Sequence, residues 1–304
     1  MTVGDLAERE LASLLAGKGL VISIGPFNIR IGSDLGDVTS LIHDLYGLYP
    51  LVSPDDFIDM HVEIASSRGL RRWIRPQVRF SVDGRSPFAP YTPDHAFPAL
   101  EWGINWCVAT RSHHFLMLHS AVVERDGLAM LFPAAPGHGK STLCTALAHS
   151  GWRLLSDEFG MVRPADGMLL PFPRLIPLKN ESIGVIKDFR PEALVGPSFY
   201  GTRKGTVAHV RPPEASIRRM GEPARARWFV FPRWVAEAPL SLEPLPKSQA
   251  FVMVATNAFN YEVLDETAFR LVAHMVDASD CYALRYSDLD QAIAALDELA
   301  SARS

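Results

Sequence analysis

Features of extracellular, zinc-binding and membrane-spanning proteins are scarce in this sequence. Its three cysteines, Cys107, Cys144 and Cys281, are widely spaced and form no CxxC pair, so neither a disulfide framework nor a zinc site is expected. No apolar run approaches the roughly 20 residues that a membrane-spanning helix needs. The segment Met1–Leu20 carries three acidic residues, which is typical of an amphipathic helix rather than a signal peptide. The sequence therefore predicts a soluble, cytoplasmic protein.

A strong excess of either charge is also missing. The formal net charge of the 304 residues is -4, so the chain has no general attraction for nucleic acid or for an anionic membrane. We expect neither as a partner, and binding of an anion must come from a local site. Hydrophobic residues make up 48% of the chain, which excludes a disordered protein and allows one large domain or two modest ones.

Residues 1–95 are predicted to form a small α+β subdomain with a mostly antiparallel sheet. Short segments there alternate apolar and polar residues and are separated by turns such as Gly25-Pro26. In the last segment, Ile74, Val78, Phe80 and Val82 are expected to share one face. The predicted strands are Val21–Ile24, Phe27–Ile31, Phe57–Ile64 and Trp73–Val82, and the predicted helix is Val38–Tyr46.

Residues 96–304 are predicted to form a second, α/β domain. A helix at Leu100–Ala109 is followed by two strands joined by a polar turn at Glu124–Gly127. Between residues 162 and 246 the segments are short and rich in Pro, Gly and Arg, which favours several strands and loops. The other predicted strands are Phe115–Val123, Leu128–Pro133, Trp152–Ser156 and Cys281–Tyr286, and the other predicted helices are Ser141–Ser150, Lys247–Phe259, Glu266–Val276 and Leu289–Ala300.

The segment after the strand Leu128–Pro133 has the pattern of a phosphate-binding loop. Gly137 and Gly139 allow positive φ, so that successive N–H groups can converge on an anion. The helix that follows adds its unsatisfied amides, Lys140 can reach the β and γ phosphates, and Ser141 can offer a hydroxyl to Mg²⁺. The loop therefore predicts a bound nucleoside triphosphate. Its predicted binding residues are Ala135, Pro136, Gly137, His138, Gly139, Lys140, Ser141 and Thr142.

One position departs from the usual pattern Gly-x-x-x-x-Gly-Lys-[Ser/Thr]. Ala134 stands at its first glycine. Alanine adopts negative φ with little strain, so the departure is tolerable if the chain does not need a left-handed residue there. The alternative is a glycine-rich turn between strand and helix that binds nothing.

An acidic pair, Asp157-Glu158, ends the strand after the helix. A right-handed β-α-β crossover is predicted to return this strand beside the phosphate-loop strand, with Asp157 near the same edge. A carboxylate there can hold Mg²⁺ or accept the proton of an attacking hydroxyl. Neighbouring strand residues point to opposite faces, so both can face a nucleotide only if the strand breaks. The alternative is a solvated acidic turn.

These segments together resemble the catalytic core of bacterial HPr kinase/phosphorylase. The resemblance rests on Leu118-His119-Ser120-Ala121, on the phosphate loop and on Gly151–Glu158, which occur in that family's order and at similar spacing. Further segments around Glu101, Pro173–Asn180 and Lys204-Gly205-Thr206 resemble the group called HprK-related kinase A. The likeness extends over most of the chain, although the family's Arg-Gly-x-Gly signature has no recognisable counterpart.

The resemblance implies an HPr kinase-type P-loop fold, related to phosphoenolpyruvate carboxykinase, and Mg²⁺-dependent phosphoryl transfer from ATP to a hydroxyl. It implies that Asp157 is the general base, that Glu158 assists Mg²⁺, and that His119 lies near the active site. Oligomers are typical of the family, so a homo-oligomer is an expectation.

Basic residues that complete the γ-phosphate site are less well defined by the sequence. Lys179 follows a proline-rich segment and can reach back to the active edge; Lys204 and Arg211 flank a glycine-containing loop. A cation near the γ-phosphate can be worth about 10³–10⁵ in rate. The main hypothesis is a kinase for a serine of a protein or peptide. A small-molecule kinase and a nucleotide-binding module without turnover remain alternatives.

Overall fold

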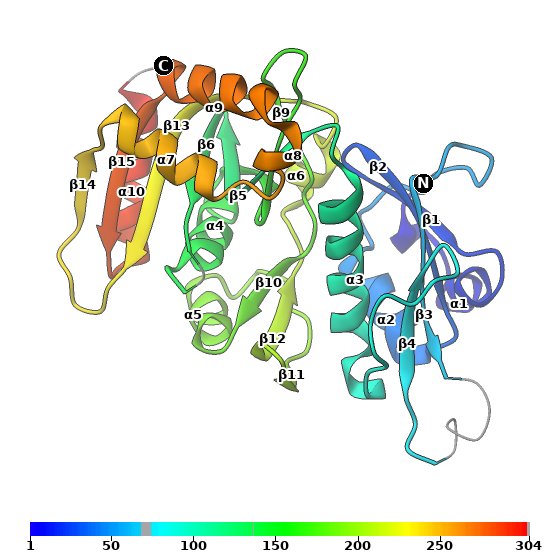
Figure 1. Ribbon diagram of the computed structural model, residues 1–304. Helices are drawn as coiled ribbons and strands as arrows, with labels where there is room; N and C mark the ends of the chain where they lie inside the picture. The colour runs from blue at the N-terminus through cyan, green and yellow to red at the C-terminus, as the bar shows by residue number, and fades with distance from the viewer. Residues whose placement is uncertain (68–73, 136, 303–304) are drawn as a thin grey trace. The chain divides into compact units, whose positions relative to one another are not determined.

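The computed structural model describes residues 1–67, 74–135 and 137–302 and has a mixed α/β fold, coloured along the chain in Figure 1. It divides into two compact units. The first comprises Met1–Arg111 and Leu194–Arg211, and the second comprises Ser112–Ala193 and Pro212–Ser304. No helix in the described part of the chain combines the length and apolar character needed to cross a bilayer.

The first unit is built on a four-stranded sheet in the order β1-β2-β3-β4. Strands β1 and β2 form a hairpin around Gly25, whose φ is 56°, β2 and β3 are parallel, and β3 and β4 are antiparallel. The sheet is thus mostly antiparallel, as predicted. The elements of this unit are η1 (Val3–Asp5), α1 (Glu8–Ala16), β1 (Leu20–Ile24), β2 (Phe27–Ser33), α2 (Gly36–Leu45), β3 (Met60–Ser66), β4 (Val78–Val82), η3 (Pro93–His95), α3 (Ala96–Arg111), β11 (Phe199–Thr202) and β12 (Gly205–Val210).

Helix α3 belongs to this first unit, although the predicted boundary at residue 95 assigned it to the second. The helix packs against β3 and β4. At Gly103 the contact is so close that a Cβ atom would lie 2.1 Å from the ring of Phe80. Only glycine therefore allows this approach, and the sequence pattern of α3 gave no sign of which sheet it covers.

Strand β4 is shorter than the predicted strand Trp73–Val82. Val78, Phe80 and Val82 are buried on one face, as predicted, but Ile74 is 68% exposed. Arg75 has a φ of 58°, and this left-handed conformation interrupts the extended chain. Trp73 lies outside the described residues.

The second unit contains a mixed sheet in the order β14-β15-β13-β6-β5-β8-β9. Strand β6 is parallel to β13 and antiparallel to β5, and β13 is parallel to β15. All residues of β6 after Leu128 are buried, which is typical of a central strand covered on both faces. The strands of this unit are β5 (Leu116–Arg125), β6 (Leu128–Pro133), β7 (Arg153–Ser156), β8 (Phe159–Val162), β9 (Leu169–Leu170), β10 (Ile176–Lys179), β13 (Arg225–Trp234), β14 (Ser241–Pro244) and β15 (Asp280–Tyr286).

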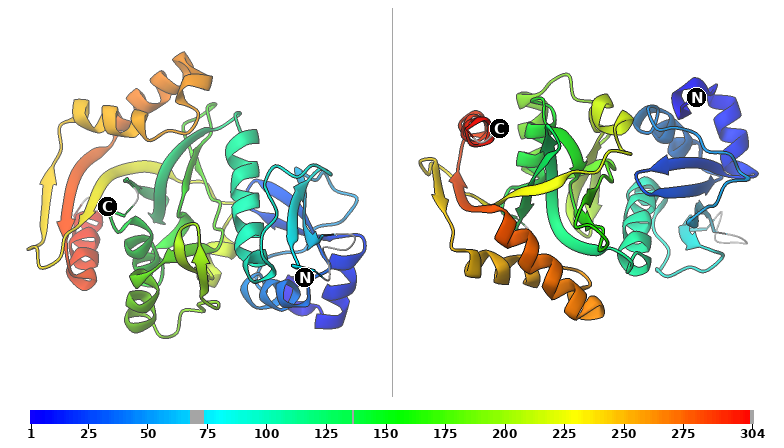
Figure 2. Two further views of the ribbon diagram at one scale, coloured as in Figure 1. Left: turned by 60° about the horizontal axis from the view of Figure 1, so that its bottom comes forward. Right: turned by 90° about the horizontal axis from the view of Figure 1, so that it is seen from above.

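Helices cover both faces of this sheet (Figure 2). On one face, α7 and α9 contribute Val254, Val272 and Met275 to a core shared with β5, β6 and β13. On the other, α4 and α10 lie together, and α5 packs on α4. The helices are α4 (Lys140–Ala148), α5 (Glu181–Phe189), α6 (Glu214–Arg218), α7 (Lys247–Thr256), α8 (Tyr261–Leu264), α9 (Glu266–Ala278) and α10 (Leu289–Ser301).

The predicted neighbourhood of the acidic strand was wrong. Strand β7 does not lie beside β6; it pairs antiparallel with β5, which separates the two. The tight turn at Asp126 and Gly127 folds β5 directly onto β6 and so occupies that edge. Glu124, predicted in a polar turn, is instead a buried residue of β5.

Candidate functional site

The phosphate loop connects the buried end of β6 to the start of α4. Gly137 and Gly139 have φ values of 88° and 84°, so both adopt the left-handed conformation that the sequence predicted. Ala134 is buried and is not among the residues with positive φ, which explains why alanine is tolerated at the first position of the pattern. Pro136, a predicted binding residue, lies outside the described residues.

Helix α4 begins at Lys140 and presents its first turn at this loop. Gly139 is the N-cap residue and, without a side chain, makes no capping hydrogen bond. The first amides of a helix have no acceptor within it, and its dipole favours negative charge at this end. Ser141 and Thr142, both half-buried, belong to the same turn. The arrangement suits a phosphate chain.

The acidic segment meets the first turn of α4. The Lys140 ammonium donates a hydrogen bond to the backbone carbonyl of Asp157 at 2.7 Å. The Ser141 hydroxyl donates to Oδ2 of the Asp157 carboxylate at 3.0 Å. The structure thus brings together three of the predicted site residues, although β7 lies one strand further from β6 than expected.

The carboxylate of Asp157 is buried and incompletely compensated. Its side chain is among the buried polar groups, with the residue 7% exposed, and no donor from the described residues reaches Oδ1. Desolvation raises the pKa of Asp157 and the charge of Glu158 raises it further, whereas Lys140, the Ser141 hydrogen bond and Lys179 oppose the rise. A buried acidic group with a raised pKa is a typical feature of functional sites.

The donor set fits Mg²⁺ bound with a nucleotide. Asp157 Oδ1 is an oxygen without a donor beside the hydroxyl of Ser141, and hard cations prefer such oxygens. The described residues contain no cluster of three or more His, Cys, Asp or Glu arranged to hold a metal. Mg²⁺ in nucleotide sites takes most of its ligands from phosphates and water, so one or two protein oxygens suffice.

The chain bends at Asp157 and Glu158, between β7 and β8, so these residues do not alternate as in a regular strand. Strands β7 and β8 pair with the same edge of β5 on either side of the bend. The Ser156 hydroxyl accepts hydrogen bonds from the N–H groups of Glu158 and Phe159, at 3.3 and 3.0 Å. Ser156 was not predicted as a site residue, yet a serine directly before a break in a strand is a recognisable turn signal.

His119 lies on β5, paired with Phe159 just after the bend. Its backbone N–H donates to the backbone carbonyl of Asn257 at 2.7 Å. The centre of its half-buried ring lies 5.2 Å from the centre of the Phe259 ring. The segment between α7 and α8 therefore holds His119 in place next to the acidic segment.

Of the candidate cations, Lys179 belongs with the acidic site by its electrostatic effect. It ends β10 and is exposed, and its charge lowers the pKa of Asp157. Lys204 and Arg211 belong to the first unit. There the Lys204 ammonium lies 5.7 Å from the centre of the Trp102 ring, and Arg211 donates to the carbonyl of Asp44 at 3.2 Å.

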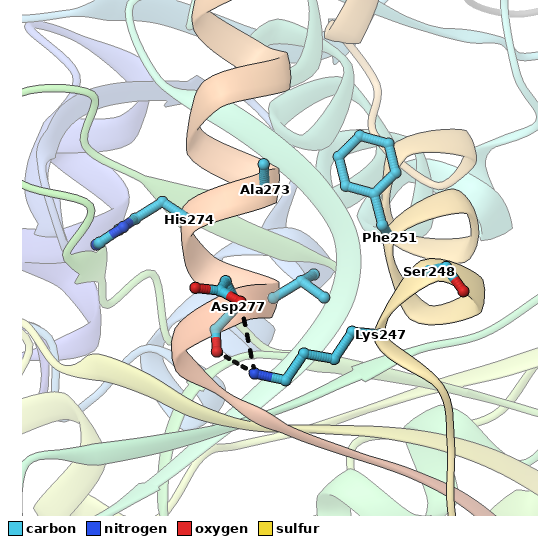
Figure 3. A pocket seen from close by; sticks show the side chains of 7 residues that line it. Lys247, Ser248, Phe251, Ala273, His274 and Asp277 are labelled. Carbon is cyan, nitrogen blue, oxygen red and sulfur yellow. Dashed lines mark hydrogen bonds and ion pairs between the residues drawn. The ribbon is translucent and has the colours of Figure 1, made fainter.

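A separate hollow of about 500 Å³ lies between α7 and α9 (Figure 3). Lys247 points across it to Asp277, where its ammonium bonds the backbone carbonyl and lies 3.8 Å from the carboxylate. None of the phosphate-loop or acidic residues lines this hollow, so it is distinct from the site above. Its lining residues are Lys247, Ser248, Phe251, Ala273, His274, Val276 and Asp277.

Comparison with known proteins adds no family assignment to this geometry. No model of a known protein family matches the chain, and a search of curated protein sequences finds no match. Function is therefore inferred from the site and from the sequence motifs.

Proposed function

We propose that this protein is an ATP- and Mg²⁺-dependent kinase that transfers the γ-phosphate to a hydroxyl, with a serine of a protein or peptide as the acceptor. The observation that carries the proposal is the meeting of Lys140, Ser141 and the buried carboxylate of Asp157 at the first turn of α4. A glycine loop alone would account for anion binding, but not for an incompletely compensated carboxylate beside it.

Each group has a role that follows from its position. The amides of the loop and of the first turn of α4 bind the phosphates, and Lys140 adds positive charge to them. Ser141 and Asp157, with Glu158 in support, would hold Mg²⁺, which neutralises charge on the phosphates when bound. A carboxylate with a raised pKa is also a better proton acceptor, so Asp157 can take the proton of the attacking hydroxyl.

The motif resemblance supports the same reading. The order of His119, the phosphate loop and Asp157 along the chain is similar to that of HPr kinase/phosphorylase, and we propose an HPr kinase-type P-loop core for the second unit. In that arrangement His119 and Lys179 flank the reacting groups, and a homo-oligomer is the expected assembly.

The first test is binding of Mg²⁺–ATP to the full chain by calorimetry, with Lys140→Ala as the site variant. We expect the substitution to weaken binding by roughly 10²-fold or more, because it removes a charge-assisted contact. Lys187→Ala is the matched control, since Lys187 is an exposed lysine on α5, and it should bind as the unaltered protein does. Equal binding by the Lys140→Ala variant would contradict the proposal.

The second test is transfer of labelled γ-phosphate to serine-containing peptides and, in parallel, to small polyols and sugars. Mass spectrometry of the products locates the phosphate. Transfer to a serine is the expected result, whereas transfer only to a small polyol or sugar indicates a small-molecule kinase. Tight ATP binding with no transfer to any of these acceptors indicates a nucleotide-binding module without turnover.

A further inference from the structure

An exposed tryptophan is attached to the phosphate loop from the neighbouring strand. Strand β13 pairs with β6 up to the partners Phe229 and Leu131, then continues for five more residues to Trp234. There the N–H of Trp234 donates to the carbonyl of His138 at 3.1 Å. The end of β13 is therefore bonded to the loop itself, not only to the sheet.

Trp234 and Tyr286 form one wall of the loop. They are direct partners on the parallel strands β13 and β15, so their side chains point to the same face. A Cβ atom on Gly139 would lie 2.6 Å from the Tyr286 hydroxyl and 3.0 Å from Cβ of Trp234. The Tyr286 hydroxyl donates to the Gly139 carbonyl at 3.2 Å. This close contact fixes Trp234 relative to the start of α4.

The exposed part of Trp234 is its apolar ring. Its indole Nε1 already donates to the carbonyl of Ser287 at 3.1 Å, yet the residue is 48% exposed. No aromatic or cationic side chain in the described ranges stacks on the ring. An indole with its N–H satisfied internally offers solvent a π surface, and burial of that surface by a flat ligand is favourable.

We propose that Trp234 is the platform on which the base of the bound nucleotide stacks. This inference rests on the proposed nucleotide binding and adds a residue to it. A base is tied through ribose to the phosphates at the start of α4, so it must leave the loop along one of its walls, and Trp234 supplies an aromatic one. Stacking does not read the edge of a base, so the platform accepts adenine and guanine alike and favours both over smaller pyrimidines.

The experiment compares ligands with and without a base. Binding of Mg²⁺–ATP, GTP, CTP and inorganic tripolyphosphate is measured by calorimetry for the unaltered full chain and for Trp234→Ala, Trp234→Phe and Phe269→Ala. Trp234→Ala should raise the Kd for ATP and GTP about tenfold and leave that for tripolyphosphate unchanged. Trp234→Phe, which keeps a ring, should change the Kd for ATP less than Trp234→Ala does. Phe269→Ala, a matched change at an exposed ring on α9, should have no effect.

Three outcomes would overturn the inference. If Trp234→Ala weakens ATP and tripolyphosphate equally, Trp234 supports the loop and not the base, and the proposed kinase function stands. If the variant binds ATP as tightly as the unaltered protein does, the base lies elsewhere. If the unaltered chain binds neither ATP nor tripolyphosphate, the proposed function itself fails and the platform with it.

Discussion

The buried charged residues at the two ends of β7 differ in how far their charge is compensated by neighbouring groups. At its start, the side chain of Arg153 is 3% exposed and forms an ion pair with the fully buried carboxylate of Glu124 on β5. Its Nη1 also donates to the carbonyls of Arg219 and Glu222, each at 2.8 Å. Both Nε and Nη1 of Arg153 therefore have acceptors, and the result is a structural clamp between two strands and a loop.

At the other end, Asp157 is buried without such compensation. Lys140 bonds its backbone carbonyl rather than its carboxylate, and Oδ1 has no donor from the described residues. Burial raises the pKa of Asp157, whereas at Glu124 an arginine is in direct contact with the carboxylate. The difference is that the Glu124 carboxylate is part of an internal ion pair, whereas the Asp157 carboxylate is the one that the proposed function assigns to a ligand.

Among the changes that test this comparison, Asp157→Asn is expected to have the largest effect, which is on the rate of phosphate transfer. The substitution keeps the shape of the side chain and its contact with Ser141, but removes the proton acceptor. We expect phosphate transfer to fall by about 10²–10⁴-fold, measured in single-turnover assays, with ATP binding retained. Asp166→Asn alters an exposed, ion-paired carboxylate and serves as the control. A normal rate of phosphate transfer by the Asp157→Asn variant would contradict the proposal that Asp157 is the general base.

Arg153→Met is expected to act on stability instead. It leaves the buried carboxylate of Glu124 with Arg219 alone, whose Nη2 lies 3.8 Å from Oε2. Because breaking a buried pair costs about 3–5 kcal/mol in the free energy of unfolding, we expect a loss towards the lower end of that range. Urea denaturation measures the loss.

The matched control for the clamp is Arg163→Met. The Arg163–Asp166 pair is exposed, and its loss should cost about 1 kcal/mol or less. Equal losses in the two variants would mean that Arg153 is not a clamp.

Substitution of the phosphate-loop glycines, Gly137 and Gly139, by alanine is expected to have a smaller effect on stability and on ATP binding. Both have positive φ, so alanine at either should cost about 1–2 kcal/mol of backbone strain. Apart from its chain neighbours, no described residue lies within 4 Å of a Cβ on Gly137, but a Cβ on Gly139 meets Tyr286 and Trp234. Gly139→Ala should therefore weaken ATP binding more than Gly137→Ala, as calorimetry can establish. The opposite order would show that the Trp234–Tyr286 wall is not in close contact with the loop in solution.

The smallest expected effect is on the pH dependence of unfolding without nucleotide. The pKa of Asp157 is raised in the folded state above its ordinary value of 3.8. At pH values between these two pKa values, the native protein therefore binds more protons than the unfolded chain does. The contribution of Asp157 to stability is present below that window and is lost as pH rises through the folded pKa.

Asp157→Asn should remove this dependence and raise Tm above the window, while leaving it nearly unchanged at acid pH. Thermal unfolding of both proteins at several pH values measures the difference. A lower Tm of the variant at neutral pH would indicate that the Asp157 carboxylate is compensated after all.

Local patterns in the sequence predicted most of the local structure around the candidate site. The strand before the loop, the positive φ of Gly137 and Gly139, and the helix from about residue 140 each follow from a few adjacent residues. The convergence of Lys140 and Asp157 also followed, because one strand, one helix and one strand in succession return the chain to the same edge.

Contacts between distant residues could not be predicted in this way. Glu124 reads as a turn residue until its partner Arg153 is known, and nothing near either residue identifies the other. Strand β7 pairs with β5 because β5, which precedes β6 in the sequence, folds back onto β6 and occupies the predicted edge. Trp234 ends an apolar strand, and its relation to the loop depends on sheet order alone.

The contact between His119 and the α7–α8 segment has a consequence for biosynthesis. The buried side chain of Asn260 accepts from the N–H of Met117 at 2.9 Å and donates to the carbonyl of Phe115 at 2.8 Å, next to the bond between His119 and Asn257. These partners lie about 140 residues apart in the chain. In a nascent chain, the strand that carries His119 cannot complete these contacts until residue 260 has left the ribosome.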